Sequence, residues 1–137
     1  MFNDCIYFNL TTLTRKITKI WQEEFNKLGL SPSHGYLLFA MQEQPNASQK
    51  KLAEIMELDA STITRFIDTL ISKGLAEKST RGKGAAFTIT PSGTKEYKKI
   101  KKTMNLLYEQ MKSHFGDKAF SQFVDELYIA RQSFKEE

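Results

Sequence analysis

The chain has 137 residues, of which 40% are apolar, and this is enough for one folded domain with its own core. Its single cysteine excludes an internal disulfide, and the sequence has no signal-peptide pattern and no apolar run of transmembrane length, so we expect a cytoplasmic protein without a membrane partner. The positive charge is concentrated in residues 48–102, which contain 12 Lys and Arg and 6 Asp and Glu. This distribution suits either a polyanion-binding surface or an ordinary solvated one.

The first third of the chain predicts two helices. Apolar residues recur every three or four positions through residues 6–28, as in a long amphipathic helix, and Gly29 is placed to end it. Ser31 and Pro32 have the order of an N-cap followed by proline at the first helical position. The second helix should therefore run from there to residues 44–45.

Two shorter helices are predicted next. Ser48 is the expected N-cap of the first, and either Asp59 or Ser61 caps the second. The second helix should bury one stripe, made of Ile63, Phe66, Ile67, Leu70 and Ile71. Gly74 follows it as a helix stop.

The rest of the chain predicts a small hairpin and two helices. Residues 75–79 and 85–90 have the pattern of short strands around a glycine-containing turn. Thr90 and Pro91 then start a long helix that ends near residue 115. A last helix should place its apolar side chains inward: Phe120, Phe123, Val124, Leu127, Ala130 and Phe134.

The two short helices have the spacing of a helix-turn-helix. Ala53 is the small residue that such a pair needs where its helices cross, and Glu57 occupies the turn position that often holds glycine. The supporting apolar positions are filled by Leu52, Met56, Leu58, Ile63 and Phe66. Because a hairpin follows at once, the pattern predicts the winged variant of this motif.

Hydroxyl and guanidinium groups lie on the opposite face of the second short helix, at Ser61, Thr62, Thr64 and Arg65. Short hydroxyl side chains let a helix enter a major groove deeply, and Arg65 is the candidate for a bidentate guanine contact. The alternative is that Ser61 and Thr62 are capping residues and Arg65 a surface charge.

Flanking residues suit contacts to the phosphate backbone. Ser48, Lys50 and Lys51 lie at the start of the supporting helix, and Arg81 and Lys83 lie in the glycine-rich turn. The alternative for the last two is an ordinary tight turn with solvated charges.

The order of these elements resembles the MarR family of transcriptional regulators over nearly the whole chain. The most specific blocks are "LAEIMELDASTITRFIDTLISKGL" and "ITPSG". The resemblance implies a mainly α fold with a β-hairpin wing, in which residues 31–90 form a winged helix-turn-helix and residues 1–30 and 91–137 form dimerisation helices. It also implies a homodimer, usually a repressor, that binds an inverted repeat in double-stranded DNA through residues at Ser61, Thr62, Thr64, Arg65 and the wing Arg81. The turn is shorter than the family's usual wing and lacks its aspartate.

Two further groups of residues are candidates for regulating DNA binding. Family members often release DNA on binding a phenolic ligand or on oxidation, and Trp21, His34, Tyr36 and Phe39 are candidates to line an aromatic effector pocket, with ordinary core packing as the alternative. Cys5 is the candidate oxidant sensor, with Tyr7 and Tyr36 expected to lie beside it in the fold, against the alternative of an ordinary thiol.

Other functional classes have weaker support. The sequence shows no catalytic pairing, phosphate loop or metal-ligand spacing, so we expect neither an enzyme nor a cofactor or metal. The remaining alternative is a winged helix used only for protein interaction, without sequence-specific DNA binding.

Overall fold

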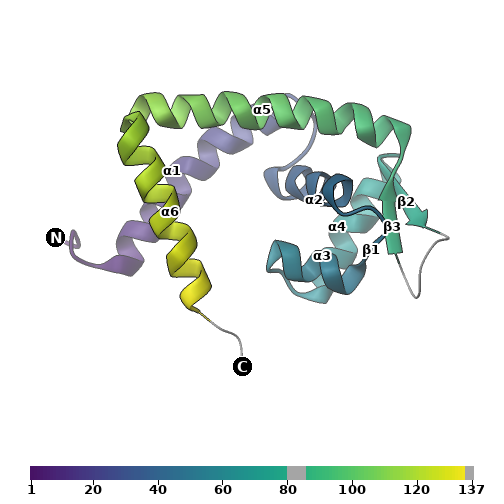
Figure 1. Cartoon of the computed structure of the whole chain (residues 1–137), viewed down its shortest axis with the longest axis horizontal. Helices are drawn as coiled ribbons and strands as arrows, with labels where there is room; N and C mark the ends of the chain where they lie inside the picture. Colours follow the sequence, from purple (N-terminus) through teal and green to yellow (C-terminus); the bar gives the residue numbers. More distant parts are fainter. Residues whose placement is uncertain (80–85, 135–137) are drawn as a thin grey trace. The chain divides into compact units, whose positions relative to one another are not determined.

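The computed structural model describes residues 1–79 and 86–134 (Figure 1). The chain divides into two compact units, Met1–Thr103 and Met104–Glu137, and helix α5 (Pro91–Phe115) contributes to both. The first unit also contains α1 (Ile6–Asn26), α2 (Pro32–Glu43), β1 (Ala47–Ser48), α3 (Gln49–Met56), α4 (Ala60–Ser72), β2 (Ala76–Ser79) and β3 (Ala86–Ile89). The second unit also contains α6 (Asp117–Ser133). This mainly helical chain with one small sheet confirms the predicted fold class.

Among the described residues of the first unit, a side-chain oxygen caps four helices by accepting a hydrogen bond from the backbone N–H three residues on. The acceptor is a hydroxyl oxygen before α2, α3 and α5 and a carboxylate oxygen before α4, at distances of 2.8–3.2 Å. Such caps satisfy an N–H that has no partner within its helix. Ser31, Ser48 and Thr90 are confirmed as caps, and Asp59 is the one used of the two candidates before α4.

The core of the first unit lies among α2, α3, α4 and the sheet, which Figure 1 shows grouped together. Its most deeply buried side chains are at most 1% exposed and include Leu37, Leu38, Met41, Leu52, Ile63, Ile67 and Leu70. Helix α1 joins this core through Phe25, which lies so close to Gly35 of α2 that a β-carbon there would come within 3.0 Å of the ring. Helices α1 and α2 are therefore packed tightly at this point.

The sheet has three antiparallel strands in the order β1-β3-β2. Strands β2 and β3 form the predicted hairpin, with Ala76 opposite Ile89 and Ser79 opposite Ala86. Strand β1 pairs with the other edge of β3 and was not predicted, because two residues are too few to show an alternating pattern. This third strand attaches the start of α3 to the hairpin.

The ITPSG segment joins α5 to the end of α4. The backbone N–H of Thr90 donates to the Leu75 carbonyl oxygen at 3.1 Å, and the Thr90 hydroxyl donates to the Gly74 carbonyl oxygen at 2.6 Å. Gly93 is buried, and a β-carbon at this position would overlap the Leu75 carbonyl oxygen. Only glycine allows α5 to approach the base of the hairpin so closely, which gives this sequence motif a packing reason.

The second unit buries Leu107 and Met111 beside a group of aromatic rings. Phe120 is buried, with its ring centre 5.0 Å from that of Tyr108 and 6.1 Å from that of Phe115. The ring of Phe123 lies 5.9 Å from that of Phe115. These contacts attach α6 to the end of α5.

Several side chains predicted to face inward are exposed, so that part of the prediction is wrong. In α6, Val124 is 41% exposed, and Phe134, which lies just beyond the helix end, is 85% exposed. Leu58, predicted to support the helix pair, is 36% exposed. The apolar periodicity identified the helices, but it did not show how much of each stripe a single chain covers.

Candidate nucleic-acid interface

Helix α4 divides into a buried face and an exposed one. Ile63, Ile67 and Leu70 are at most 1% exposed and fix the helix on the core, while Ser61, Thr64 and Arg65 are exposed and Thr62 is half-buried. The four polar residues predicted for DNA contact therefore lie on the first two turns of a helix whose other face is anchored.

The start of α4 is organised by the carboxylate of Asp59. Its Oδ1 accepts hydrogen bonds from the Thr62 backbone N–H at 2.8 Å and from the Ser61 hydroxyl at 2.9 Å. Together with a bond from the Thr62 hydroxyl, these bonds stabilise the ionised carboxylate and lower the pKa of Asp59 below its usual range. The hydroxyl hydrogen of Ser61 is thus used within the helix cap, which partly supports the capping alternative for this residue.

Arg65 reaches back along the helix surface. Its Nη2 donates to the Thr62 hydroxyl oxygen at 3.4 Å, a long and therefore weak bond. Because Arg65 is exposed, this bond can be exchanged for a contact to a base edge or a phosphate at low cost.

Gln49 is a residue of this surface that the sequence analysis missed. Its side-chain amide donates to the Thr64 hydroxyl oxygen at 2.5 Å and to the Ala60 carbonyl oxygen at 3.2 Å, so the first residue of α3 is bonded to the first turns of α4. These partners lie 11 and 15 residues after Gln49 in the chain, and pairing over such a distance leaves no recognisable pattern in a single sequence.

The predicted flanking cations on α3 are available to solvent. Lys50 and Lys51 are exposed, and Ser48 caps the helix by accepting from the Lys51 backbone N–H at 3.0 Å. That cap uses an oxygen lone pair of Ser48, so its hydroxyl hydrogen can still donate to a phosphate. Arg81 and Lys83, predicted for the wing, lie outside the described residues.

The turn between α3 and α4 has the conformation expected for its motif. Glu57 adopts the left-handed conformation, with φ 52° and ψ 45°, and the Leu58 backbone N–H donates to the Ala53 carbonyl oxygen at 3.1 Å. This backbone region favours glycine, which explains why the sequence position commonly holds one.

The four candidate effector residues contact different neighbours, and their grouping in one pocket stays a prediction. The Trp21 indole N–H donates to the Tyr36 hydroxyl at 3.0 Å, but the Phe39 ring lies against Tyr97 at 5.1 Å. The His34 ring lies 4.6 Å from Phe66. Each aromatic side chain of α2 points in its own direction because successive residues of a helix are 100° apart.

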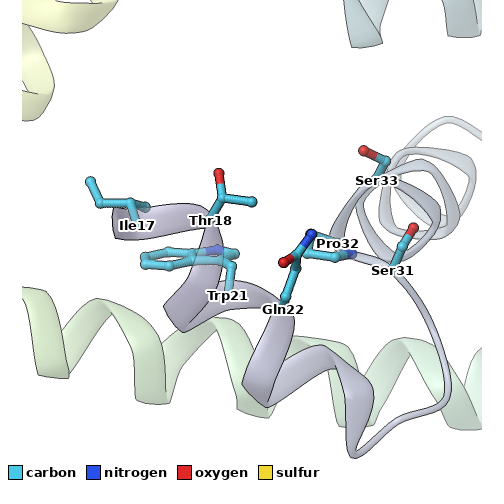
Figure 2. A pocket seen from close by; sticks show the side chains of 7 residues that line it. All are labelled: Ile17, Thr18, Trp21, Gln22, Ser31, Pro32 and Ser33. Atoms are coloured by element: carbon cyan, nitrogen blue, oxygen red, sulfur yellow. The ribbon is translucent and has the colours of Figure 1, made fainter. Parts of the chain in front are cut away.

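A small cavity of about 320 Å³ does lie beside Trp21, between α1 and the start of α2 (Figure 2). Its lining residues are Ile17, Thr18, Trp21, Gln22, Ser31, Pro32 and Ser33. Figure 2 shows the indole ring along the α1 side and Pro32 on the α2 side. Of the four candidates, only Trp21 lines this cavity.

His34 lies between the cavity and helix α4. Its Nδ1 lies 2.5 Å from the hydroxyl oxygen of Ser31, which lines the cavity, and its ring contacts Phe66 of α4. Burial and the nearby Lys73 ammonium lower the pKa of His34, so the folded protein favours the neutral imidazole.

Cys5 is the N-cap residue of α1. Its sulfur accepts from the Phe8 backbone N–H at 3.5 Å, and the residue is exposed. Tyr36 does not flank it, because Tyr36 is bonded to Trp21, which lies sixteen residues or about 24 Å further along the same helix.

Neither a metal-binding cluster nor a membrane-spanning helix is found in the part of the chain that the structure describes. In residues 1–79 and 86–134, no cluster of three or more His, Cys, Asp and Glu side chains is placed to bind a metal ion. Within the same ranges, no helix is both long and apolar enough to cross a membrane.

By fold and surface, the chain is a winged helix-turn-helix protein, in which α3 and α4 form the helix pair and β2 and β3 form the hairpin. Residues 30–81 match the model of the MarR family. This match confirms the resemblance predicted from the sequence.

The whole chain is also similar to individual regulators. The uncharacterized HTH-type transcriptional regulator YxaD of Bacillus subtilis (strain 168) is 29% identical over 134 residues, which cover 96% of this chain and 94% of that protein. The transcriptional repressor CouR bound to p-coumaroyl-CoA has the same fold, with a TM-score of 0.89 and 14% identity over 96% of this chain and 94% of CouR. CouR bound to a 23-mer DNA duplex gives a TM-score of 0.87 and 13% identity over 93% of each chain.

Proposed function

We propose that the protein is a sequence-specific DNA-binding transcriptional regulator. The observation that carries this proposal is the division of α4 into a face anchored in the core and an outer face with Ser61, Thr64 and Arg65. A rigidly held helix with short polar side chains and one guanidinium fits a major groove. The DNA complex of CouR, a repressor with the same fold, supports this assignment.

The proposed active form is a homodimer. Large apolar side chains are exposed at the start of α1 and along α5 and α6: Ile6, Tyr7, Phe8, Leu10, Leu106, Tyr108, Val124, Tyr128 and Ile129. Apolar surface of this extent on a small protein usually marks a protein contact. A two-fold dimer carries two recognition helices for two half-sites about 34 Å apart. A monomer in light scattering at micromolar concentration would contradict this part of the proposal.

We further propose that the protein represses transcription and that a small aromatic ligand releases it from DNA. The cavity beside Trp21 is at the lower end of the range for small-molecule sites and offers an indole ring together with the hydroxyls of Thr18, Ser31 and Ser33. CouR, which has the same fold, binds p-coumaroyl-CoA. Because Trp21 is the only tryptophan, its fluorescence reports on this cavity. Titration with p-coumarate should quench it and lower DNA affinity, and no change in either signal would exclude this class of ligand.

Oxidation of Cys5 is the second route by which DNA release is proposed. The thiol is exposed, although its sulfur also caps α1. If peroxide acts through this thiol, the Cys5→Ser variant should keep its DNA affinity after peroxide treatment while the wild type loses it. Equal loss in both proteins would exclude Cys5 as the sensor.

Selection of bound sequences from a random DNA pool tests the proposed function directly. The wild type should enrich an inverted repeat. On that site Arg65→Ala should cost about 1–3 kcal/mol and relax the preference at one base pair. Arg15→Ala, which removes an exposed arginine of α1, is the matched control and should leave the preference unchanged. Failure to enrich any sequence would contradict the proposal, and an equal loss on all sequences for Arg65→Ala would contradict the role of that residue.

A further inference from the structure

The side-chain amide of Gln49 is oriented by its two partners in α4. Its nitrogen lies near the Thr64 hydroxyl oxygen at 2.5 Å and the Ala60 carbonyl oxygen at 3.2 Å. A reversed amide would place its oxygen against the Ala60 carbonyl oxygen, two acceptors with no hydrogen between them. The amide therefore donates one hydrogen to each partner and clamps α3 to α4.

The hydroxyl of Thr64 is fully engaged as a donor. Its single hydrogen goes to the Ala60 carbonyl oxygen at 2.9 Å, and its oxygen accepts from Gln49. Thr64 therefore has no hydrogen left for a DNA acceptor unless one of these bonds breaks. The residue is nevertheless exposed, and the other branch of its β-carbon is a methyl group.

We propose that Gln49 is a positioning residue that turns Thr64 so that α4 presents a methyl group, and not a hydroxyl, to the C5-methyl of a thymine. Threonine in a helix otherwise divides between two rotamers, and a partner that holds the hydroxyl selects one of them. A threonine methyl against a thymine methyl is an effective way to read this base in the major groove. The inference rests on the proposed DNA-binding function and adds one specific base contact to it.

Replacement of each thymine of the selected site by deoxyuridine, one at a time, tests the contact. At one position the wild-type affinity should fall roughly fourfold, which corresponds to about 0.8 kcal/mol for one buried methyl group. Thr64→Val should keep this preference, because valine has a methyl on both branches of its β-carbon. Thr64→Ser should lose it. Thr69→Ser is the matched control, since the Thr69 hydroxyl makes the same type of bond, to the Arg65 carbonyl oxygen at 3.1 Å, on the same helix.

A double-mutant comparison tests the role of Gln49. Gln49→Ala should reduce the preference for thymine over uracil when residue 64 is threonine, because only the bond to the Ala60 carbonyl oxygen then opposes a change of the Thr64 rotamer. In the Thr64→Val background the same substitution should leave the preference unchanged. A merely structural role for Gln49 would lower the affinity for both bases equally in both backgrounds.

Three outcomes would overturn this inference while leaving the proposed function intact. They are an unchanged preference in Thr64→Ser, a wild-type affinity that no deoxyuridine alters, and an equal effect of Gln49→Ala in the two backgrounds. A wild type that enriches no sequence at all would overturn the proposed function itself, and with it the inference.

Discussion

Replacement of Gly93 by alanine should destabilise the protein even though alanine is the better helix former. An added β-carbon would lie closer than 3.0 Å to the Leu75 carbonyl oxygen and 3.1 Å from the β-carbon of Ile89. The obstacle is backbone, and the same carbonyl accepts a hydrogen bond from Thr90, so no side-chain rotation can relieve the overlap. Helix α5 would have to move away from the base of the hairpin.

The size of the effect follows from two opposing terms. Overpacking of this kind costs about 3 kcal/mol at the upper end of its usual range, while the exchange of glycine for alanine in a helix gains about 1 kcal/mol. The net loss is about 2 kcal/mol, which for a chain of this size lowers Tm by roughly 7 °C.

Thermal unfolding followed by circular dichroism measures this difference. Ser92→Ala is the matched control, because Ser92 is the exposed neighbour in the same turn and its replacement should change Tm little or raise it slightly. If Gly93→Ala unfolded at the wild-type temperature or above it, the close approach of α5 to the hairpin would not be a constraint on this position.

Three further predictions concern pH and packing. Burial and the Lys73 ammonium lower the pKa of His34, so its contribution to the stability of the fold should be complete above pH 6.5. The contribution should fall as the pH drops through the lower pKa of the folded state. In thermal unfolding measured across this pH range, His34→Gln should lose the dependence. Asp59, whose pKa is lowered chiefly by the Thr62 backbone N–H, should contribute above pH 3.8 and lose that contribution in stronger acid. Asp59→Asn should lose the acid dependence and, because it keeps a capping oxygen without the charge, should lower the neutral-pH Tm less than Asp59→Ala does. Gly35→Ala should lower Tm because the new methyl overlaps the Phe25 ring, and Phe25→Leu in the same chain should offset part of that loss.

Features that depend on neighbours in the chain were predictable from the sequence. The caps at Ser31, Ser48 and Thr90 act on backbone groups three residues away, so the residue type and the following helical pattern are sufficient to place them. The buried face of α4 follows from the helical repeat in the same way. The left-handed turn at Glu57 is a local signal too, since the motif fixes its distance from Ala53.

Features that depend on the tertiary fold were not predictable. The hydrogen bond from Trp21 to Tyr36 joins two helices that are separate in the sequence. The positions of Tyr36 and Phe39 along α2 likewise do not show that Phe39 packs against Tyr97 of α5. Apolar periodicity also does not distinguish a face covered by the same chain from one left exposed, as Val124 shows. The cavity was missed in part because Ser31 and Ser33 have no aromatic or ionisable group to mark them.

The hydroxyl groups of α4 show how tertiary contacts change the chemistry that a sequence offers. Ser61 and Thr64 each give their only hydroxyl hydrogen to a protein oxygen, the first to Asp59 and the second to Ala60. The Thr62 hydroxyl also bonds to the Asp59 carboxylate, and its oxygen accepts from Arg65 at 3.4 Å. All three hydroxyls are thus engaged by neighbouring protein groups. Direct readout by donors should rest mainly on Arg65, while Thr64 acts through its methyl group and Ser61 and Thr62 through the stability of the helix start.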